Sequence, residues 1–543
     1  MLDRGFLRRM VVIIGPLLLA CAHGPRAQAA PKIVSAFPLG GPRGTTVEVE
    51  LQGTALEGSY AVWLGPGTRL ESPKSDLAYQ YTKASDGVEA YVKAIKGGSQ
   101  ATVRLVLAAD ARIGFHRLSL VSPAGLSESM PFWVGPDAVI VEASASHNNL
   151  ETAQPVKLPV AVNGRISEGR QFAHYAFEIA REQTLAFEVI SFQGAGFDPQ
   201  LALYEAGGSY LDAHRSKRLV FHEEVTQGGM PANRRMTYHF TIAGRYVVRI
   251  SNLFAQAGKG CSYLLRIAPP DRAPEAEDAL SWARGRLQEL RSKSVGAMAA
   301  DVVLVKKVEP NDDPAQAQVF SVPAVLEGAI GRPGDIDRFR FKAKAGQKLA
   351  FEVKTPRAAP PYFNLRMDVL DGKGTVVLSN LRVQDGKVGT VDSKVIQVSS
   401  GLVGKLEHEG EYSLRIRDLS SLQGSPDHVY WVLARPQIPH VGDVRVQPEG
   451  PCNLPAGARQ RLTLSVQGKE DYAGTPALSV EGLPQGVRAF VGANGSTVDL
   501  VADASAPHTP MPQAVRIFGL PTIGEKSGSA FLLAEIPVMV VKK

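Results

Sequence analysis

Cysteines and catalytic signatures are scarce in this chain. Only three of its 543 residues are cysteines. The sequence contains no Cys-x-x-Cys pair, no Gly-x-Ser-x-Gly elbow, no phosphate-binding glycine loop and no His-Glu-x-x-His zinc motif. His222-Glu-Glu-Val-Thr226 and His408-Glu-Gly-Glu-Tyr412 both lack the second histidine that such a zinc motif needs. We therefore expect no enzyme, and the sequence offers no catalytic residue.

A strong charge of one sign is also lacking. The formal net charge is +7, and part of that surplus lies in the first 29 residues, where Arg4, Arg8, Arg9 and Arg26 outnumber Asp3. No arginine-rich run or aromatic-basic motif accompanies the remaining surplus. The sequence therefore predicts no nucleic-acid partner.

Long hydrophobic runs are missing as well. The longest one near the N-terminus, Met10–Ala20, is too short to cross about 30 Å of hydrocarbon as a helix. It follows Arg8 and Arg9 and precedes the small-residue site Ala27-Gln28-Ala29, which is the pattern of a signal peptide over residues 1–29. We therefore expect export to the periplasm, the cell surface or the extracellular space.

The same N-terminal region allows a second route of processing. Leu18-Leu19-Ala20-Cys21 resembles a bacterial lipobox, in which acylation of Cys21 makes the protein a lipoprotein. Cleavage after Ala29 instead leaves only Cys261 and Cys452, which lie in different predicted domains. Both routes stay open, a lipid anchor at Cys21 is the only membrane contact we expect, and we favour two buried thiols over a disulfide.

An internal repeat is the most informative feature that is present. Residues Gly164–Val189 align without gaps to Gly328–Val353 at an offset of 164, and Gly244–Ile250 align to Gly410–Ile416 at an offset of 166. In both copies apolar residues alternate with polar ones, as in strands that bury one face. Two copies of one antiparallel β-sandwich are therefore predicted.

The segments on either side of the repeat show the same alternation. Thr45–Leu51 and Thr102–Leu107 lie before it, and Arg461–Val466 and Ser496–Val501 lie after it. Between the copies, a stripe of apolar residues ending at Leu290 predicts one helix, which we interpret as a linker packed on a neighbouring domain rather than a partner-binding helix. The predicted all-β tandem array consists of a signal peptide (1–29), an Ig-like domain (31–135), a sandwich (136–270), a helical linker (271–300), a second sandwich (301–437) and a C-terminal Ig-like sandwich (438–543).

The second copy has a recognisable polar signature. Glu309-Pro-Asn-Asp-Asp-Pro-Ala-Gln-Ala317, followed by Gly328 and by Gly334-Asp-Ile-Asp-Arg-Phe-Arg-Phe341, resembles the bacterial pre-peptidase C-terminal domain. The first copy keeps the framework but not this signature. The resemblance implies a jelly-roll-like sandwich used for attachment or for maturation of secreted peptidases.

The outer domains carry weaker resemblances. Gly40–Thr46 is similar to immunoglobulin-like IPT/TIG-type domains of bacterial surface proteins. Pro451–Gly457 with Gly482–Gly486 is similar to the sandwich ends of planctomycete-type secreted proteins.

Some relatives of the pre-peptidase domain bind calcium near the first strand, and calcium takes six to eight oxygen ligands. The first copy has Ala145, His147, Asn148, Gln171 and Ala173 at the equivalent places, so we expect metal at most in the second copy. The alternative is that Asp335 and Asp337 merely cap a turn and face solvent on an alternating strand. The matching positions in the second copy, and hence the predicted calcium ligands, are Glu309, Asn311, Asp312, Asp335 and Asp337.

These observations favour a non-catalytic binding or adhesion protein whose modules meet polysaccharide, matrix or envelope proteins, with no cofactor required. An accessory or maturation factor for a secreted peptidase is the alternative. Three of the four tryptophans, Trp63, Trp133 and Trp431, could stack on sugars, but we expect them to fill cores. Among the eleven histidines, His174 and His239 both lie within predicted strands and are the first candidates for a functional role.

Overall fold

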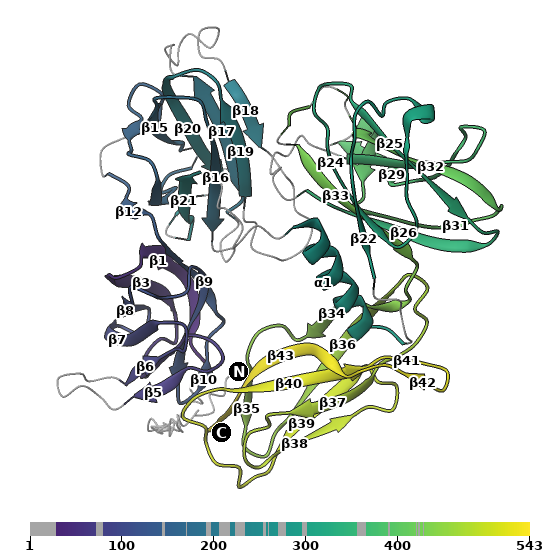
Figure 1. Cartoon of the computed structure of the whole chain (residues 1–543). Helices are drawn as coiled ribbons and strands as arrows, with labels where there is room; N and C mark the ends of the chain where they lie inside the picture. The colour runs from purple at the N-terminus through teal and green to yellow at the C-terminus, as the bar shows by residue number, and fades with distance from the viewer. Residues whose placement is uncertain are drawn as a thin grey trace, which may run out of the picture.

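The computed structural model describes residues 29–71, 80–143, 147–169, 171–191, 197–205, 218–222, 234–252, 257–258, 260–269, 278–295, 301–355, 365–388, 391–419, 421, 424–426 and 428–542. Within these residues the regular structure is almost entirely strand (Figure 1), the exceptions being helix α1 (Ala279–Ser292) and a 3-10 turn at Pro314–Gln316. The all-β fold class is confirmed. The predicted signal peptide and Cys21 lie outside the described residues apart from Ala29.

The first module, residues 31–135, is a sandwich of two sheets. One sheet has the strand order β1-β3-β8-β7-β6-β5, and the other has the order β10-β9-β11-β2 with β4 also pairing β9. Its strands are β1 (Lys32–Phe37), β2 (Gly40–Pro42), β3 (Thr46–Thr54), β4 (Ala61–Trp63), β5 (Arg69–Glu71), β6 (Tyr81–Lys83), β7 (Val88–Lys96), β8 (Gln100–Leu107), β9 (Gly114–Ser122), β10 (Gly125–Leu126) and β11 (Met130–Gly135).

The second module, residues 136–270, pairs two five-stranded sheets of order β12-β14-β21-β16-β19 and β13-β15-β20-β17-β18. Its strands are β12 (Ala138–Val141), β13 (Gln154–Pro155), β14 (Val160–Arg165), β15 (Ala173–Ile179), β16 (Gln183–Ser191), β17 (Pro199–Glu205), β18 (Arg218–His222), β19 (Arg234–Phe240), β20 (Gly244–Asn252) and β21 (Ser262–Ala268).

The third module, residues 301–437, repeats that order strand for strand, as β22-β24-β33-β26-β31 and β23-β25-β32-β27-β28, and adds the hairpin β29-β30. The sequence repeat is therefore also a repeat of topology. Its strands are β22 (Val303–Lys306), β23 (Gln318–Val319), β24 (Ala324–Ala329), β25 (Ile336–Ala343), β26 (Gln347–Lys354), β27 (Leu365–Leu370), β28 (Val376–Ser379), β29 (Leu381–Val388), β30 (Val391–Val398), β31 (Gly401–Leu406), β32 (Gly410–Asp418) and β33 (Val429–Pro436).

The fourth module, residues 438–543, packs a sheet of order β34-β36-β39-β38 on one of order β35-β43-β40-β37, with the small pair β41-β42 beside them. Its strands are β34 (His440–Gln447), β35 (Cys452–Pro455), β36 (Arg459–Lys469), β37 (Ala477–Glu481), β38 (Val487–Val491), β39 (Thr497–Ala502), β40 (Gln513–Leu520), β41 (Thr522–Ile523), β42 (Lys526–Ser527) and β43 (Phe531–Val541).

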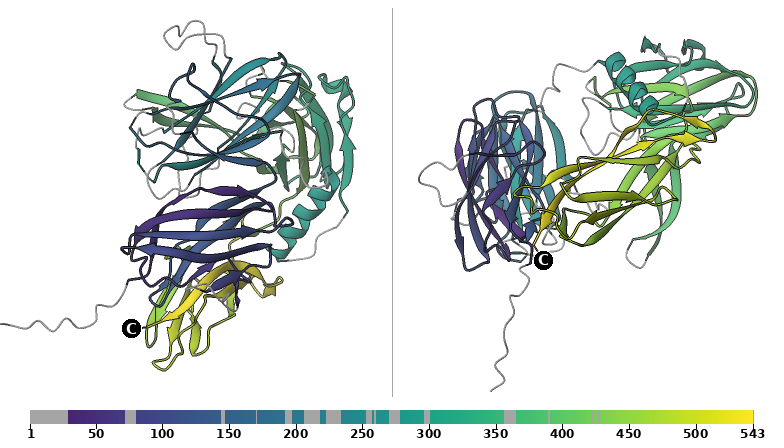
Figure 2. Two further views of the ribbon diagram at one scale, coloured as in Figure 1. Left: turned by 90° about the vertical axis from the view of Figure 1, so that its left-hand side faces the viewer. Right: turned by 90° about the horizontal axis from the view of Figure 1, so that it is seen from below.

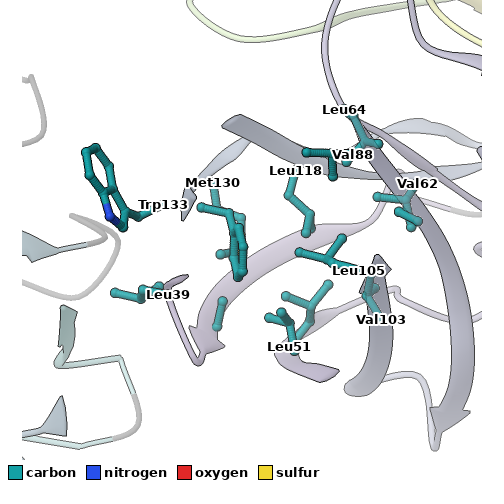
Figure 3. Close-up of a cluster of buried hydrophobic side chains, with 14 of the residues drawn as sticks. Leu39, Leu51, Val62, Leu64, Val88, Val103, Leu105, Leu118, Met130 and Trp133 are labelled. Carbon is teal, nitrogen blue, oxygen red and sulfur yellow. The ribbon is translucent and has the colours of Figure 1, made fainter. Parts of the chain in front are cut away.

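Each module encloses its own apolar core, because alternate side chains of facing sheets point inward. In the first module, Leu51 and Leu105 from one sheet meet Leu118 and Met130 from the other (Figure 3). Trp133 extends this core toward the second module, where Leu264 joins the same apolar cluster. The first two modules are thus joined by continuous packing.

The helix α1 is a packed linker. Asp278 caps its N-terminus by accepting a hydrogen bond from the Ser281 backbone N–H at 2.7 Å. The buried stripe of the helix, which includes Ala283 and Leu287, packs on Val325 and Trp431 of the third module. The described part of the predicted linker therefore belongs structurally to the third module.

The first and last modules lie side by side although they are far apart in sequence (Figures 1 and 2). Trp63 and Leu126 of the first module share an apolar cluster with Met539 and Val541 of the fourth. Trp63, Trp133 and Trp431 are 4%, 9% and 6% exposed, so all three fill apolar clusters, and the side chains have too little free face to stack on a sugar.

Cys261 and Cys452 are free, buried thiols in the cores of different modules, as expected.

Candidate functional site

The predicted calcium ligands of the third module come from two segments. Glu309, Asn311 and Asp312 lie in the connection after β22, and Asp335 and Asp337 lie just before and within β25. Carboxylate oxygens of Glu309, Asp335 and Asp337 all lie within 4.8 Å of one another. The structure therefore brings together three of the four carboxylates that the sequence singled out.

Lys307 occupies the space among these carboxylates. Its Nζ lies 2.6 Å from Glu309 Oε1, 3.0 Å from Asp335 Oδ2 and 2.6 Å from Asp337 Oδ1, and it donates to the Ala329 carbonyl at 2.7 Å. The lysine side chain is 10% exposed. An ammonium has three N–H donors and no acceptor, so the four surrounding oxygens satisfy all of its hydrogen-bonding capacity.

Two further side chains complete the cluster, which we call the Lys307 cluster and define as Lys307, Glu309, Asn311, Asp335, Asp337 and Tyr430. In the orientation that satisfies its hydrogen bonds, the Asn311 amide nitrogen donates to Asp337 Oδ1 at 3.2 Å and to Glu309 Oε2 at 3.1 Å. The buried Tyr430 hydroxyl donates to Asp337 Oδ2. Asp337 thus receives donors on both of its oxygens.

Burial and charge act against each other in this cluster. Burial raises the pKa of Asp337 to about 6, although Lys307 and Tyr430 both act to lower it. Burial alone would lower the pKa of Lys307, but its hydrogen bonds to Asp337 and Glu309 outweigh that effect and raise the pKa above its ordinary value. Lys307 is therefore firmly held as a cation.

Asp312 is not part of the Lys307 cluster. Its carboxylate pairs with Arg332 and accepts the Ile336 backbone N–H at 3.2 Å, and its side chain is 43% exposed. Asp312 therefore lies at the surface beside the Lys307 cluster. The alternative that Asp335 and Asp337 face solvent is wrong, because their side chains are 2% and 0% exposed, although Asp335 does cap a turn by accepting the Gly331 backbone N–H at 2.7 Å.

Calcium does not fit this donor set as it stands. The point where a cation would meet the three carboxylates is filled by the Lys307 ammonium, and Asn311 turns N–H groups rather than its oxygen toward Asp337 and Glu309. Calcium needs at least six oxygens, which requires Lys307 to leave. Sequence reasoning missed Lys307, which lies two residues before Glu309 and outside the recognised motif.

The second module has a carboxylate where the third has this lysine. The Glu142 backbone N–H donates to the Asn163 carbonyl, and the Lys307 N–H donates to the equivalent carbonyl of Glu327. The Glu142 carboxylate accepts from the Arg165 N–H at 2.7 Å, and the Tyr175 and Tyr263 hydroxyl oxygens lie 3.3 and 3.4 Å from it. The two hydroxyls are also 2.7 Å apart, so one of them donates to the other. His147 Nε2 lies 3.5 Å away.

The carboxylates of the third module have no counterpart here. Gln171 and Ala173 replace them, as the sequence indicated, and Ala145 lies outside the described residues. No metal-binding group of three acidic, histidine or cysteine side chains occurs in the described part of the second module.

The two histidines that the sequence singled out have different surroundings. Burial is the main cause that lowers the pKa of His174 to about 4, and its Nδ1 lies 3.2 Å from the His147 carbonyl. His239 is 46% exposed and pairs with Glu182 and Thr184. Neither ring nitrogen faces a serine or cysteine nucleophile in these contacts.

One pocket of about 230 Å³ lies between the first and fourth modules, lined among others by Trp63, Ser119, Arg117 and Glu449. Two of its lining residues, Trp63 and Leu126, belong to the apolar cluster that joins these modules, so the shape of the pocket depends on that contact.

Comparisons with known proteins add little beyond this geometry. No family model and no curated protein matches the chain. Among solved structures, it is similar to the pre-peptidase C-terminal domain of a collagenase from Bacillus anthracis, at 14% identity and a TM-score of 0.16 over 21% of this chain and 93% of that one.

Two larger structures are also similar. One is SGBP-B from a xyloglucan utilization locus in Bacteroides uniformis, with 11% identity, a TM-score of 0.16 and coverage of 44% of this chain and 74% of that one. The other is the S-layer protein rSbsC, with 10% identity, a TM-score of 0.14 and coverage of 94% and 54%. Likeness at this level identifies neither a ligand nor an activity.

The described residues include no helix with the length and hydrophobicity that a membrane span requires.

Proposed function

We propose that this chain is an exported, non-catalytic binding protein that presents β-sandwich modules to polysaccharide, matrix or envelope proteins. The observation that carries the proposal is the way in which the modules are joined. Because the first and last modules contact each other directly, the modules cannot move independently. Their outer faces and loops are therefore held at fixed positions relative to one another.

The contact between the first and fourth modules has specific geometry. Asn453 accepts the Leu126 backbone N–H at 2.8 Å and donates to the Leu126 carbonyl at 2.9 Å, as a neighbouring strand would. Gly125 permits the approach, because a Cβ there would collide with the Asn453 amide. The Tyr60 hydroxyl donates to the Pro510 carbonyl at 2.7 Å. The contact is therefore both polar and apolar.

The third and fourth modules are joined through buried charges. Arg435, which is 0% exposed, pairs with Glu352 of its own module and with Glu470 of the fourth at 2.6 Å. Arg286 of α1 binds the same Glu352 at 2.7 Å. Because removing one partner of a buried ion pair is costly, this network resists separation of the two modules.

The proposal is tested by capture from the producing cell. The immobilised full-length mature protein is incubated with cell-envelope extract and, as a control, with cytosol. We expect a polysaccharide or an envelope protein to be retained from the envelope extract only. Recovery of one specific peptidase would instead favour an accessory or maturation role.

Catalysis is tested separately with hydrolase substrates. Turnover that a single point substitution abolishes would overturn the non-catalytic assignment.

A further inference from the structure

The outer face of one sheet in the third module is rich in arginine. Strands β25, β32 and β27 lie side by side, with Arg338 opposite Arg415 and Arg366 opposite Arg417. Residues Phe339, Leu414 and Met367, which alternate with these arginines, point into the core, so the arginines share the opposite face. The surface formed by Arg338, Arg340, Arg366, Arg415 and Arg417 is called the arginine face.

Carboxylates of the same module neutralise the arginine face only in part. Asp368 lies on the same face, is fully buried, and pairs with Arg366 at 3.0 Å and with Arg415 at 2.7 Å. Arg340 pairs with Glu411 at 3.2 Å. These two carboxylates therefore form ion pairs with three of the five guanidinium groups.

Arg338 and Arg417 have no carboxylate partner among the described residues. Arg338 Nε donates to the Asp312 backbone carbonyl at 2.8 Å, and Arg417 makes one long contact of 3.5 Å with Ser421 Oγ. Burial lowers the pKa of Arg338, and the charge of Arg415 lowers it further. Burial also lowers the pKa of Arg417, where the charge of Arg366 and then that of Arg415 add to the effect. Like charges thus crowd together here without full compensation.

The second module does not share this surface. Only Arg249, the counterpart of Arg415, remains there, and its guanidinium lies over the rings of Phe172 and Tyr204 at 4.8 and 5.6 Å. The sheet fold therefore does not require the arginines. The residues at the places of Arg338, Arg340, Arg366 and Arg417 in the second module are His174, Ala176, Gln200 and Ser251.

We propose that the arginine face binds an anionic polysaccharide through its carboxylate or sulfate groups. Guanidinium forks bind such groups in a bidentate manner. Neighbouring positions on a sheet lie about 5 Å apart across strands and about 7 Å apart along a strand, so the face offers a regular row of cations to a polymer with regularly spaced anions.

A polysaccharide fits this face better than an acidic protein does. Protein interfaces are built around buried aromatic or aliphatic anchors. On this face Leu370 is buried and Ile336 is half-buried, whereas Val319 of the edge strand β23, which pairs with Arg340, is 64% exposed. One small valine at the sheet edge is a poor anchor for a protein interface. This inference rests on the proposed binding function and narrows its ligand class.

The test measures binding of the full-length mature protein to soluble polygalacturonate, with uncharged dextran as the neutral probe, at low and high salt. We expect binding to polygalacturonate that weakens as salt rises, because salt screens the attraction between the polymer's carboxylates and the half-buried guanidinium groups. We expect no binding to dextran. The double variant R338Q/R417Q should bind at least fivefold more weakly. Because neither arginine has a carboxylate partner, its melting temperature should stay close to that of the wild type.

A matched control removes the same charge elsewhere. Arg69 of the first module and Arg445 of the fourth are exposed and have no ion pair among the described residues, so R69Q/R445Q should bind within twofold of the wild type.

If R338Q/R417Q and R69Q/R445Q weaken polygalacturonate binding equally, the polymer is attracted by the protein's net charge rather than by the arginine face. That result would overturn the inference. Dextran binding that R338Q/R417Q leaves intact would also overturn it while sustaining the binding function. Failure to bind either polymer, with envelope capture preserved, overturns only the ligand class. Failure of capture as well overturns both proposals.

Discussion

The second and third modules have the same strand order but opposite charges at one internal position. Lys307 of the third module lies among three carboxylates, whereas Glu142 of the second lies among two tyrosine hydroxyls and a histidine. Yet Tyr263 and Tyr430 occupy the same place, and in each module a glycine, Gly164 or Gly328, makes room for the ring. The same fold thus contains a buried polar site in both modules, with a lysine at its centre in one and a glutamate in the other.

The two modules differ at several neighbouring positions of this site, and the differences compensate one another. In the third module the tyrosine hydroxyl donates to Asp337, and in the second, where Ala173 stands in that place, Tyr175 supplies the partner hydroxyl at 2.7 Å from Tyr263. Phe339 is the third-module counterpart of Tyr175 and has no such hydroxyl. A buried hydroxyl needs a partner, and the module that lacks the carboxylate has a tyrosine hydroxyl as that partner.

Removing the internal cation should produce the largest effect. Lys307→Met keeps the apolar stem but leaves three carboxylates together, and we expect the third module to lose about 3 kcal/mol of local stability. Hydrogen exchange of β24 and β25 amides in the full-length protein measures this loss. A change below about 1 kcal/mol would contradict the central role of the ammonium.

Calcium should distinguish the variant from the wild type. Lys307→Ala empties the space among the carboxylates, and millimolar Ca²⁺ should then slow exchange in β25 by at least tenfold. Wild-type protein should respond neither to Ca²⁺ nor to a chelator. A calcium response of the wild type would restore the metal site that the sequence suggested, and no response of the variant would show that its oxygens do not form a site.

The raised pKa of Asp337 predicts a dependence on pH. Because the folded pKa of about 6 lies above the ordinary value of about 3.9, the folded state holds this proton more tightly. Its stabilising contribution is fully present below about pH 4 and is lost as pH rises through 6. Relative to Asp337→Asn, the wild type should therefore lose stability between pH 4 and pH 6, measured by hydrogen exchange of β25. A difference that stays constant over this range argues against a raised pKa.

Much of the fold could be predicted from sequence, because period-two alternation and the offset of 164 depend only on local pattern. The Lys307 cluster could be predicted only in part. Glu309, Asp335 and Asp337 carry the motif of the resembling family, whereas Lys307 follows an exposed lysine and resembles any residue at a strand end. Its role depends on which way one side chain turns in three dimensions, and no spacing rule encodes that.

Replacing the second module's carboxylate should have the smallest effect. Glu142→Gln keeps an acceptor for the Arg165 N–H, and the partners that remain are neutral hydroxyls and a histidine, so we expect a loss of about 1 kcal/mol in the protection of β14 amides. Tyr175→Phe serves as the control and should cost no more, because Glu142 still accepts from Tyr263. If Glu142→Gln instead lowers local stability as much as Lys307→Met does, the two side chains contribute equally to stability. The two modules would then differ only in the sign of the charge at this position.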